Sequence, residues 1–271
     1  MRIFKQVFNF YIDGSIHVAL SCYALVRMTQ QMFQISTDEP MVYFVFFGTI
    51  VGYNFVKYEA LVRAKKAQMR KELKAISVLS FLSLLAVGFY FLQLQRITQI
   101  VSVAVLILTL LYTLPFFSNR KNARNWAGLK IYIVALCWVG VTVVLPILNA
   151  EINITSDFYF KCIQQFILIF VLILIFEIID LANDDPHLQT VPQQIGVKRT
   201  KILGLLLLIP FYFLEFLKPD FNQKQLIVNL ILVSIIALFL LFANEKRSKY
   251  YTSFWVESIP IVWWLLLLFI Q

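Results

Sequence analysis

The stretch FILIFVLILIFEIIDLANDD, residues 166–185, decides the fold of this chain. It begins with eleven apolar residues, and three of the carboxylates that follow lie at offsets of three, four and seven: Glu177, Asp180 and Asp184. These offsets place the three side chains on one face of a helix. Like charges beside hydrocarbon are costly, and a bound cation offsets that cost. Oxygen ligands suit Mg²⁺, so Glu177, Asp180 and Asp184 are predicted metal ligands. The alternative is a solvated helix end where the chain leaves the bilayer.

Apolar blocks of this kind recur along the whole sequence. Hydrophobic residues make up 60% of the chain and the mean hydropathy is +0.78, which excludes an ordinary soluble domain. Blocks of roughly twenty residues match the thickness of a hydrocarbon core. We therefore predict an all-α, polytopic membrane protein whose residues 1–271 form one transmembrane domain. The nine predicted spans cover residues 8–29, 41–62, 74–94, 98–117, 128–148, 158–183, 200–217, 224–243 and 250–270.

The basic residues are distributed unequally between the two sides that these spans define. Eighteen Lys and Arg lie in the N-terminus and in the connections that follow the second, fourth, sixth and eighth predicted spans. Five lie on the opposite side, and Lys57 lies within a span. Basic loops stay in the cytoplasm, so we predict an inner-membrane protein with a cytoplasmic N-terminus and an external C-terminus. The same loops attract anionic membrane lipid. Nucleic acid is not an expected partner, because no soluble basic module is present.

A second polar stripe ends the second predicted span, in GYNFVKYEALVRAKK at residues 52–66. Asn54, Lys57 and Tyr58 are three and four residues apart, so they share one helix face. One interpretation is a lysine that extends to the interface beside an interfacial tyrosine. The other is a polar wall that faces the carboxylates Asp180 and Asp184 across a cavity, with Lys57 answering an anion.

Two further ionisable groups fall inside predicted spans. His17 follows Asp13 by one turn, a pair that fits a satisfied buried contact or the lining of a cavity. Glu257 is another intramembrane acid and a candidate for function. The chain has no nucleophile motif, phosphate-binding glycine loop or Cys/His metal spacing. Any chemistry would therefore use Mg²⁺ and carboxylates on a membrane-embedded substrate.

These residues resemble the motifs of the UbiA superfamily of intramembrane prenyltransferases. That family has nine transmembrane helices and two aspartate-rich motifs on the cytoplasmic side. Its second motif, DxxDxxxD followed by TLPxxxG, is similar to Glu177-x-x-Asp180-x-x-x-Asp184 followed by Thr190, Pro192 and Gly196. Tyr112-Thr113-Leu114-Pro115 resembles the YSxP that ends the fourth helix of the family, with Arg120 and Lys121 after it. The resemblance covers nearly all of the chain.

The first motif departs from the family pattern NDxxDxxxD. Asn54 matches the asparagine, but Phe55, Tyr58 and Val62 stand where aspartates belong. The resemblance still implies a UbiA-like bundle around a central cavity that binds a prenyl diphosphate through Mg²⁺ on the second motif. It implies transfer of the prenyl group to a lipid-soluble acceptor, either aromatic or lipid. The catalytic residues on this interpretation are Asp180, Asp184, Asn54, Lys57 and Tyr112.

Loss of the first motif leaves two alternatives to catalysis open. The chain fits a non-catalytic homologue that binds an isoprenoid lipid or a partner protein. It also fits a small transporter, because intramembrane acids serve proton relays as well.

Overall fold

The computed structural model describes residues 2–64, 71–113, 128–182, 184, 188–219 and 223–270, and every regular element among them is helical. The α-helices are α1 (Arg2–Asp13), α2 (Ile16–Met32), α3 (Glu39–Ala64), α4 (Lys71–Phe91), α5 (Arg96–Thr113), α6 (Leu129–Val139), α7 (Leu145–Asn149), α8 (Ser156–Asp180), α9 (Val191–Ile195), α10 (Val197–Phe213), α11 (Gln223–Phe242) and α12 (Ile259–Ile270). Two π-helical turns, Gly140–Val144 and Tyr251–Val256, precede α7 and α12, and a 3₁₀ turn, Leu214–Leu217, follows α10.

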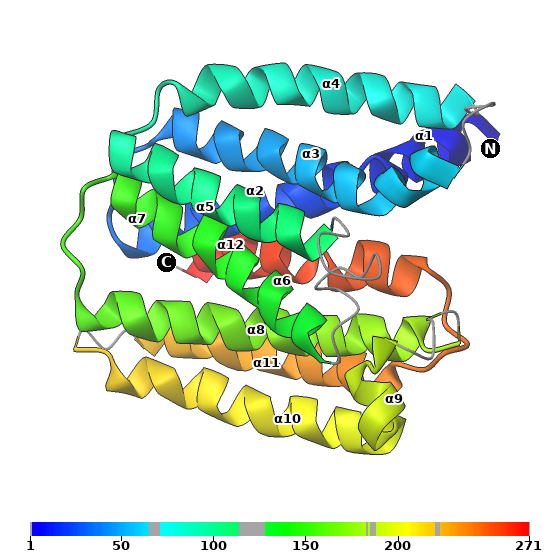
Figure 1. The fold of residues 1–271 in the computed structure, drawn as a ribbon. Helices are drawn as coiled ribbons and strands as arrows, with labels where there is room; N and C mark the ends of the chain where they lie inside the picture. Colours follow the sequence, from blue (N-terminus) through cyan, green and yellow to red (C-terminus); the bar gives the residue numbers. More distant parts are fainter. Residues whose placement is uncertain are drawn as a thin grey trace.

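The long helices run side by side between two ends of a bundle (Figure 1). The N-terminus, the start of α4, the helix α9 and the end of α11 lie at one end, which we call the basic end. The connections α2–α3, α4–α5, α7–α8 and α10–α11 lie at the opposite, outer end. The described parts of four of the five segments predicted to share one side of the membrane therefore lie at one end of the molecule.

Seven of the described helical segments are long and apolar enough to cross a membrane. They match seven of the nine predicted spans, and one of them, Lys130–Asn149, joins α6, a π-helical turn and α7. The predicted span at 98–117 corresponds to a shorter apolar helix, Arg96–Leu110. The predicted span at 8–29 is broken into α1 and α2. Nine spans therefore remain a prediction, and the chain is a helical integral membrane protein.

The break between α1 and α2 has a local cause at Gly14 and Ser15. A Cβ atom on Gly14 would lie 2.8 Å from the Phe10 carbonyl oxygen and 3.2 Å from a methyl carbon of Leu79, so only glycine fits. Ser15 follows with a φ of 62°, in the left-handed region that ends a helix. The broken helix leaves backbone carbonyls without intrahelical donors, and inside a membrane they need partners from elsewhere.

Polar residues of α2 form hydrogen bonds with a backbone carbonyl in each of the two π-helical turns. Pro146 has no N–H to offer the carbonyl of Thr142, four residues before it, and the Thr29 hydroxyl donates to that oxygen at 2.7 Å. His17 Nε2 donates to the Phe254 carbonyl at 2.9 Å, in the π-helical turn before α12, while the Tyr11 hydroxyl contacts His17 Nδ1 at 2.6 Å. His17 is therefore a buried residue with satisfied hydrogen bonds, and the partners that the structure gives it are Tyr11, Phe254 and Ser258, while the predicted pair with Asp13 stays a prediction.

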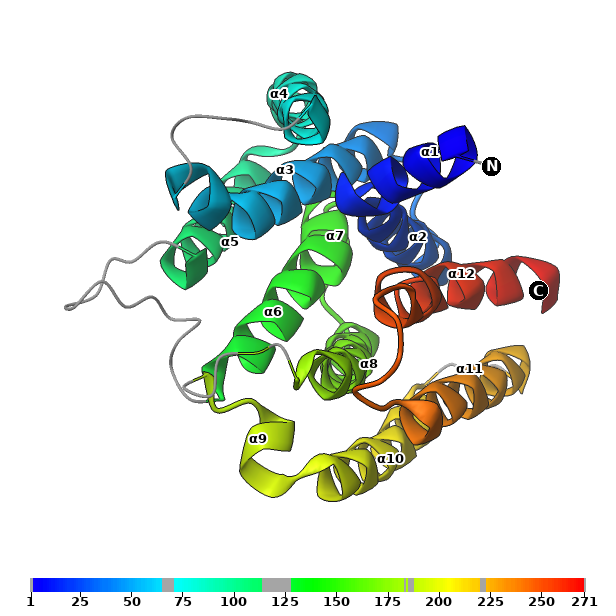
Figure 2. The ribbon, with the colours of Figure 1, turned by 90° about the vertical axis from the view of Figure 1, so that its right-hand side faces the viewer.

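Helix α8 is the central element of the bundle. In an apolar stretch of 18 residues within α8, 72% of the residues are buried, compared with 11% for the corresponding stretch of α4 at the periphery. Figure 2 shows α8 inside the bundle, with α6 on one side and α10 and α11 on the other. The apolar run FILIFVLILIF is buried on several faces because α8 has neighbours all around it. This placement fixes the position of the carboxylates that end the helix.

Candidate functional site

The acidic face predicted on 177–184 lies where α8 reaches the basic end. The Asp184 amide donates to the Asp180 carbonyl at 2.9 Å, so the helical turn continues from Asp180 to Asp184. Glu177 is 2% exposed, Asp180 is exposed and Asp184 is half-buried, so the three acids differ in their access to solvent. Oδ2 of Asp184 is buried and has no hydrogen-bond partner among the residues described. A buried carboxylate oxygen without a donor is one that a cation would stabilise.

Glu177 ties the end of α8 to the short helix α9. Its Oε2 atom accepts the Val191 amide at 3.0 Å. The Thr190 amide, one residue earlier, donates to the Gln193 side-chain oxygen at 2.9 Å, which fixes the first turn of α9. Gly196 then turns the chain into α10 with a φ of 81°, where glycine is favoured. The loop that resembles the TLPxxxG segment is thus held against the acidic face by Glu177.

Lys130, in the first turn of α6, is the cation that the structure brings to these acids. It interacts electrostatically with both Glu177 and Asp180. The start of α6 packs beside α9, since a Cβ atom on Gly128 would lie 3.9 Å from Nε2 of Gln194. In the sequence, Lys130 is one of the basic residues around the connection between the fourth and fifth predicted spans. Its position at the first turn of an apolar run was the one available signal, because a charge there stays close to the membrane surface.

The polar stripe on α3 lies against the α1–α2 junction. Asn54 is 4% exposed, and its amide donates to the Gly14 carbonyl at 3.1 Å and to the Ser80 hydroxyl at 2.9 Å. The Ser15 hydroxyl donates to Asn54 Oδ1 at 2.8 Å. Two neighbours from the α1–α2 junction and one from α4 therefore occupy the Asn54 side chain. Among the described residues, no hydrogen bond or ion pair joins it to the carboxylates of α8.

Lys57 and Tyr58 serve the same junction. The Tyr58 hydroxyl donates to the Asp13 carbonyl at 2.7 Å, and Lys57 Nζ donates to the same oxygen at 3.3 Å. Both donors thus satisfy a carbonyl freed where α1 ends. Lys57 also interacts electrostatically with Glu257, so the two ionisable groups flagged in separate spans are neighbours. Lys249 forms an ion pair with Asp13 at 3.4 Å. Asp13, Lys57, Lys249 and Glu257 thus form a charged group beside the α1–α2 junction.

The residues described at the acidic face fit a magnesium ion only in part. No group of three His, Cys, Asp or Glu side chains among them is arranged to hold a metal. Mg²⁺ in phosphate-binding sites is held by one or two carboxylates together with substrate phosphates and water. Asp180 and Asp184 meet that requirement in donor type, while Glu177 has one oxygen committed to Val191. Tyr112 lies in the last turn of α5, and its side chain is outside the described part of the chain, as are Pro115, Arg120 and Lys121.

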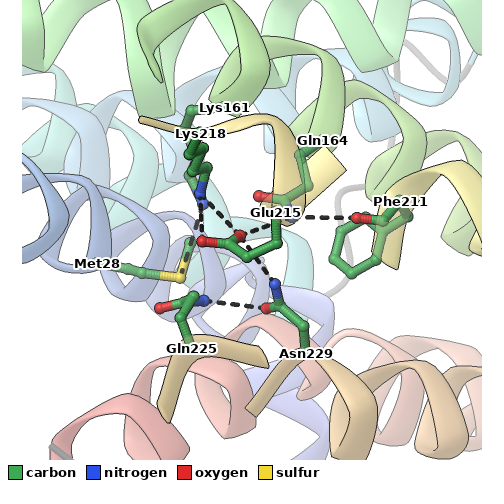
Figure 3. A network of polar contacts seen from close by, with 8 residues as sticks. All are labelled: Met28, Lys161, Gln164, Phe211, Glu215, Lys218, Gln225 and Asn229. Carbon is green, nitrogen blue, oxygen red and sulfur yellow. Dashed lines mark hydrogen bonds and ion pairs between the residues drawn. The ribbon is translucent and has the colours of Figure 1, made fainter. Parts of the chain in front are cut away.

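A second polar cluster, not foreseen from the sequence, is buried near the outer end (Figure 3). Its centre is Glu215, which is 2% exposed and accepts from Lys218 Nζ at 2.8 and 2.9 Å. The Gln164 amide donates to Glu215 at 3.3 Å, and the Asn229 amide donates at 3.1 Å. Glu215 thus joins α8, α11 and the 3₁₀ turn after α10. In a membrane interior such a carboxylate persists only when donors surround it.

Lys161 lies in the same cluster and is fully buried. Its Nζ atom lies 4.1 Å from the centroid of the Trp263 ring and 3.9 Å from the Met28 sulfur. No carboxylate pairs with it among the described residues. The ring face of tryptophan attracts a cation, so Trp263 accounts for part of the stabilisation of the Lys161 side chain. The sequence signal was the pair Lys161 and Gln164 at helical spacing inside an apolar span.

Comparison with solved structures identifies the fold. The structure of a UbiA homologue from Aeropyrum pernix K1 superposes with a TM-score of 0.68 at 13% sequence identity, over 94% of this chain and 98% of the other. The structure of a digeranylgeranylglyceryl phosphate synthase superposes with a TM-score of 0.58 at 14% identity, over 98% of each chain. No family model and no curated protein sequence matches this chain. The chain therefore has the UbiA fold over nearly its whole length.

Proposed function

We propose that this protein is a membrane prenyltransferase that moves a prenyl group from a prenyl diphosphate to a lipid-soluble acceptor, aromatic or lipid. The observation that carries the proposal is the acidic face of α8 at the basic end of a UbiA-fold bundle. Asp180 is exposed there, Asp184 has a buried oxygen without a donor among the described residues, and Lys130 is adjacent. Such a group binds a diphosphate together with its cation better than either one alone.

Each residue of this site has a distinct role in the proposal. Asp180 and Asp184 bind Mg²⁺, and Glu177 fixes α9 beside them, with its second oxygen as a further ligand. Lys130 contributes a positive charge to the diphosphate oxygens. Tyr112 shields positive charge that develops on the prenyl carbon, as the face of an aromatic ring does. The bound Mg²⁺ would supply charge neutralisation for the departing diphosphate.

In this reaction the bond between the first prenyl carbon and the diphosphate oxygen breaks, and the electron pair leaves with the diphosphate. The acceptor forms the new bond to that carbon and releases a proton. The diphosphate leaves with more negative charge than it carried as an ester, so cations beside it stabilise the transition state more than the ground state. Lys130 is placed to act in this way, because it already neighbours the carboxylates.

The α3 stripe takes an indirect role in the proposal. Asn54 and Lys57 were predicted to assist the diphosphate, but both donate to carbonyls at the α1–α2 junction. We propose that they position this junction, and that Lys57 reaches the substrate only by exchanging the Asp13 carbonyl for a phosphate oxygen. Lys57 is exposed and its hydrogen bond of 3.3 Å is long, which makes such an exchange inexpensive.

A binding assay with purified protein tests the proposal. Prenyl diphosphates of two chain lengths are titrated with and without Mg²⁺. We expect Mg²⁺-dependent binding that Asp180→Asn and Asp184→Asn each reduce at least about tenfold, because each removes a charged ligand. Glu245→Gln is the matched control, since Glu245 is an exposed carboxylate near the same end. Absence of binding by the wild-type protein at every Mg²⁺ concentration contradicts the proposal.

A second candidate function is binding of an isoprenoid lipid without catalysis. It is favoured by the positions Phe55, Tyr58 and Val62, which offer no carboxylate, and by the hydrogen bonds that occupy Asn54. The same titration separates the two functions when an acceptor is added. Tight binding that never releases diphosphate with any aromatic or lipid acceptor supports the binding protein.

We also propose that the basic end faces the cytoplasm and that the C-terminus is external. The support is the excess of Lys and Arg at that end. Single cysteines at Lys198 and Glu151, in a chain without Cys22, Cys137 and Cys162, test this orientation. A membrane-impermeant reagent added outside should label position 151 and leave position 198 unlabelled, and the reverse pattern contradicts the assignment.

A further inference from the structure

A group of cations lies where the start of α10 meets the end of α11, apart from the acidic face. The two helices are antiparallel neighbours, as Figures 1 and 2 show. Their approach is close, because a Cβ atom on Gly204 would lie 2.5 Å from a methyl carbon of Leu240. The first turn of α10 and the last turn of α11 are therefore held together at the membrane surface.

Two cations bind the last carbonyls of α11 and so join the two segments. Lys201 Nζ donates to the Leu241 carbonyl at 2.7 Å, and Arg247 Nε donates to the Phe242 carbonyl at 3.2 Å. These carbonyls end a helix and have no intrahelical donor. Lys201 and Arg247 thus form the inner part of a basic patch, and their hydrogen bonds to backbone carbonyls fix the positions of their side chains.

Three more cations complete the patch and have their charges unpaired. The side chains of Lys198, Arg199 and Lys246 are exposed, and none has an ion-pair or hydrogen-bond partner within the described residues. Glu245 is the one acid in the 244–249 connection. The first turn of α10 adds the positive end of a helix dipole, since Gly196 provides no side-chain cap. The patch therefore carries a net positive charge that the described protein does not neutralise.

Apolar side chains continue from the patch along the outer faces of both helices. The exposed fractions are 48% for Ile202 and 57% for Leu206 on α10, and 50% for Leu241 and 59% for Phe242 on α11. A ligand on this surface must present negative charge at the basic end and hydrocarbon beside the helices. An anionic phospholipid has this chemistry, whereas a free phosphate or a nucleic acid has no part that would cover the apolar faces.

We propose that the basic patch of Lys198, Arg199, Lys201, Lys246 and Arg247 binds the headgroup of an anionic phospholipid, whose chains lie against Ile202 and Phe242. Lys198, Arg199 and Lys246 contact the phosphate directly. Lys201 and Arg247 hold the two helix ends in register and add long-range attraction. The site is separate from the acidic face and does not depend on the proposed transfer reaction.

Local fluorescence quenching tests the site in the full chain. A fluorophore is attached to Ile202→Cys in a protein lacking the three native cysteines, and the protein is placed in phosphatidylcholine bilayers. Brominated phosphatidylglycerol or brominated phosphatidylcholine is then added as quencher. We expect a clear preference for the anionic lipid, and the triple variant K198Q/R199Q/K246Q should lower that preference roughly tenfold or more.

The control variant K5Q/K74Q/R96Q removes the same number of positive charges from exposed positions elsewhere. It should leave the lipid preference at position 202 unchanged. An equal loss in both triple variants would show general attraction of anionic lipid and overturn the site. A wild-type protein that shows no preference for phosphatidylglycerol also overturns it. Failure of the diphosphate assay leaves this result untouched, because no residue is shared.

Discussion

The Asn54 side-chain amide donates to the Gly14 carbonyl oxygen across a helix interface, at 3.1 Å. The residue that best matches the first family motif is thus a donor to a broken helix. A membrane interior offers no water to a freed carbonyl, so a side chain must supply the hydrogen bond. This requirement accounts for a polar residue at position 54 without any substrate.

Replacing Asn54 tests that structural role. Asn54→Leu should lower the unfolding free energy by about 1–3 kcal/mol, because it leaves the Gly14 carbonyl and Ser15 hydroxyl buried without partners. Unfolding in mixed micelles of increasing denaturing detergent measures the change. Tyr58→Phe, which removes one hydrogen bond, should cost less. Unchanged stability in Asn54→Leu, with loss of diphosphate binding, would instead assign Asn54 to the substrate.

Lys130 and Lys57 should differ in their effect on diphosphate binding. Lys130→Met should weaken diphosphate binding at saturating Mg²⁺, because Lys130 neighbours Glu177 and Asp180. Lys57→Met should weaken it less, since Lys57 donates to Asp13. Dissociation constants for one prenyl diphosphate measure both effects. A larger loss of affinity in Lys57→Met would indicate that the diphosphate binds at the polar stripe of α3.

Glu177 is expected to control the order of α9. Glu177→Ala removes the acceptor of the Val191 amide, so amide hydrogen exchange should accelerate in residues 190–196 and stay unchanged in α11. Gln193→Ala is the comparison, because it removes only the acceptor of the Thr190 amide. Equal exchange rates in wild type and Glu177→Ala would contradict the anchoring role.

The buried cluster at the outer end should respond differently to loss of each lysine. Lys218→Met leaves the Glu215 carboxylate without its ion-pair partner and should cost about 3–5 kcal/mol of stability. The double variant K218M/E215L should recover much of that loss. Lys161→Met should be close to neutral, because methionine keeps the packing against Trp263 and removes a buried charge. Thermal unfolding in detergent measures the stability of all three variants, and a double variant that is no more stable than Lys218→Met would contradict the pairing.

Glycine substitutions test the close contact between α10 and α11. Gly204→Ala places a methyl group 2.5 Å from Leu240, so overpacking should cost about 1–3 kcal/mol. Gly88→Ala in α4 meets no atom within 4 Å and should be neutral or stabilising by about 0.5–1 kcal/mol. The same unfolding measurement compares them, and equal effects would argue against tight packing at position 204.

The sequence by itself determined the fold class and the end of the molecule at which the acids lie. Apolar blocks of membrane length predicted the helices, and seven of the nine blocks meet the criteria of a spanning segment in the described structure. The residues Glu177, Asp180 and Asp184 could be placed on one helix face because helical periodicity is local. Local patterns of this kind need no knowledge of neighbouring helices.

Only the tertiary structure decided what each polar side chain contacts. Asn54 and Gly14 are forty residues apart, and Lys161 and Trp263 lie on α8 and α12, so no spacing rule connects either pair. Likewise, Lys130 was one of many basic residues until packing of α6 brought it to the α8 carboxylates. Inside a membrane every buried polar group must find a partner, and the identity of that partner depends on which helices pack together.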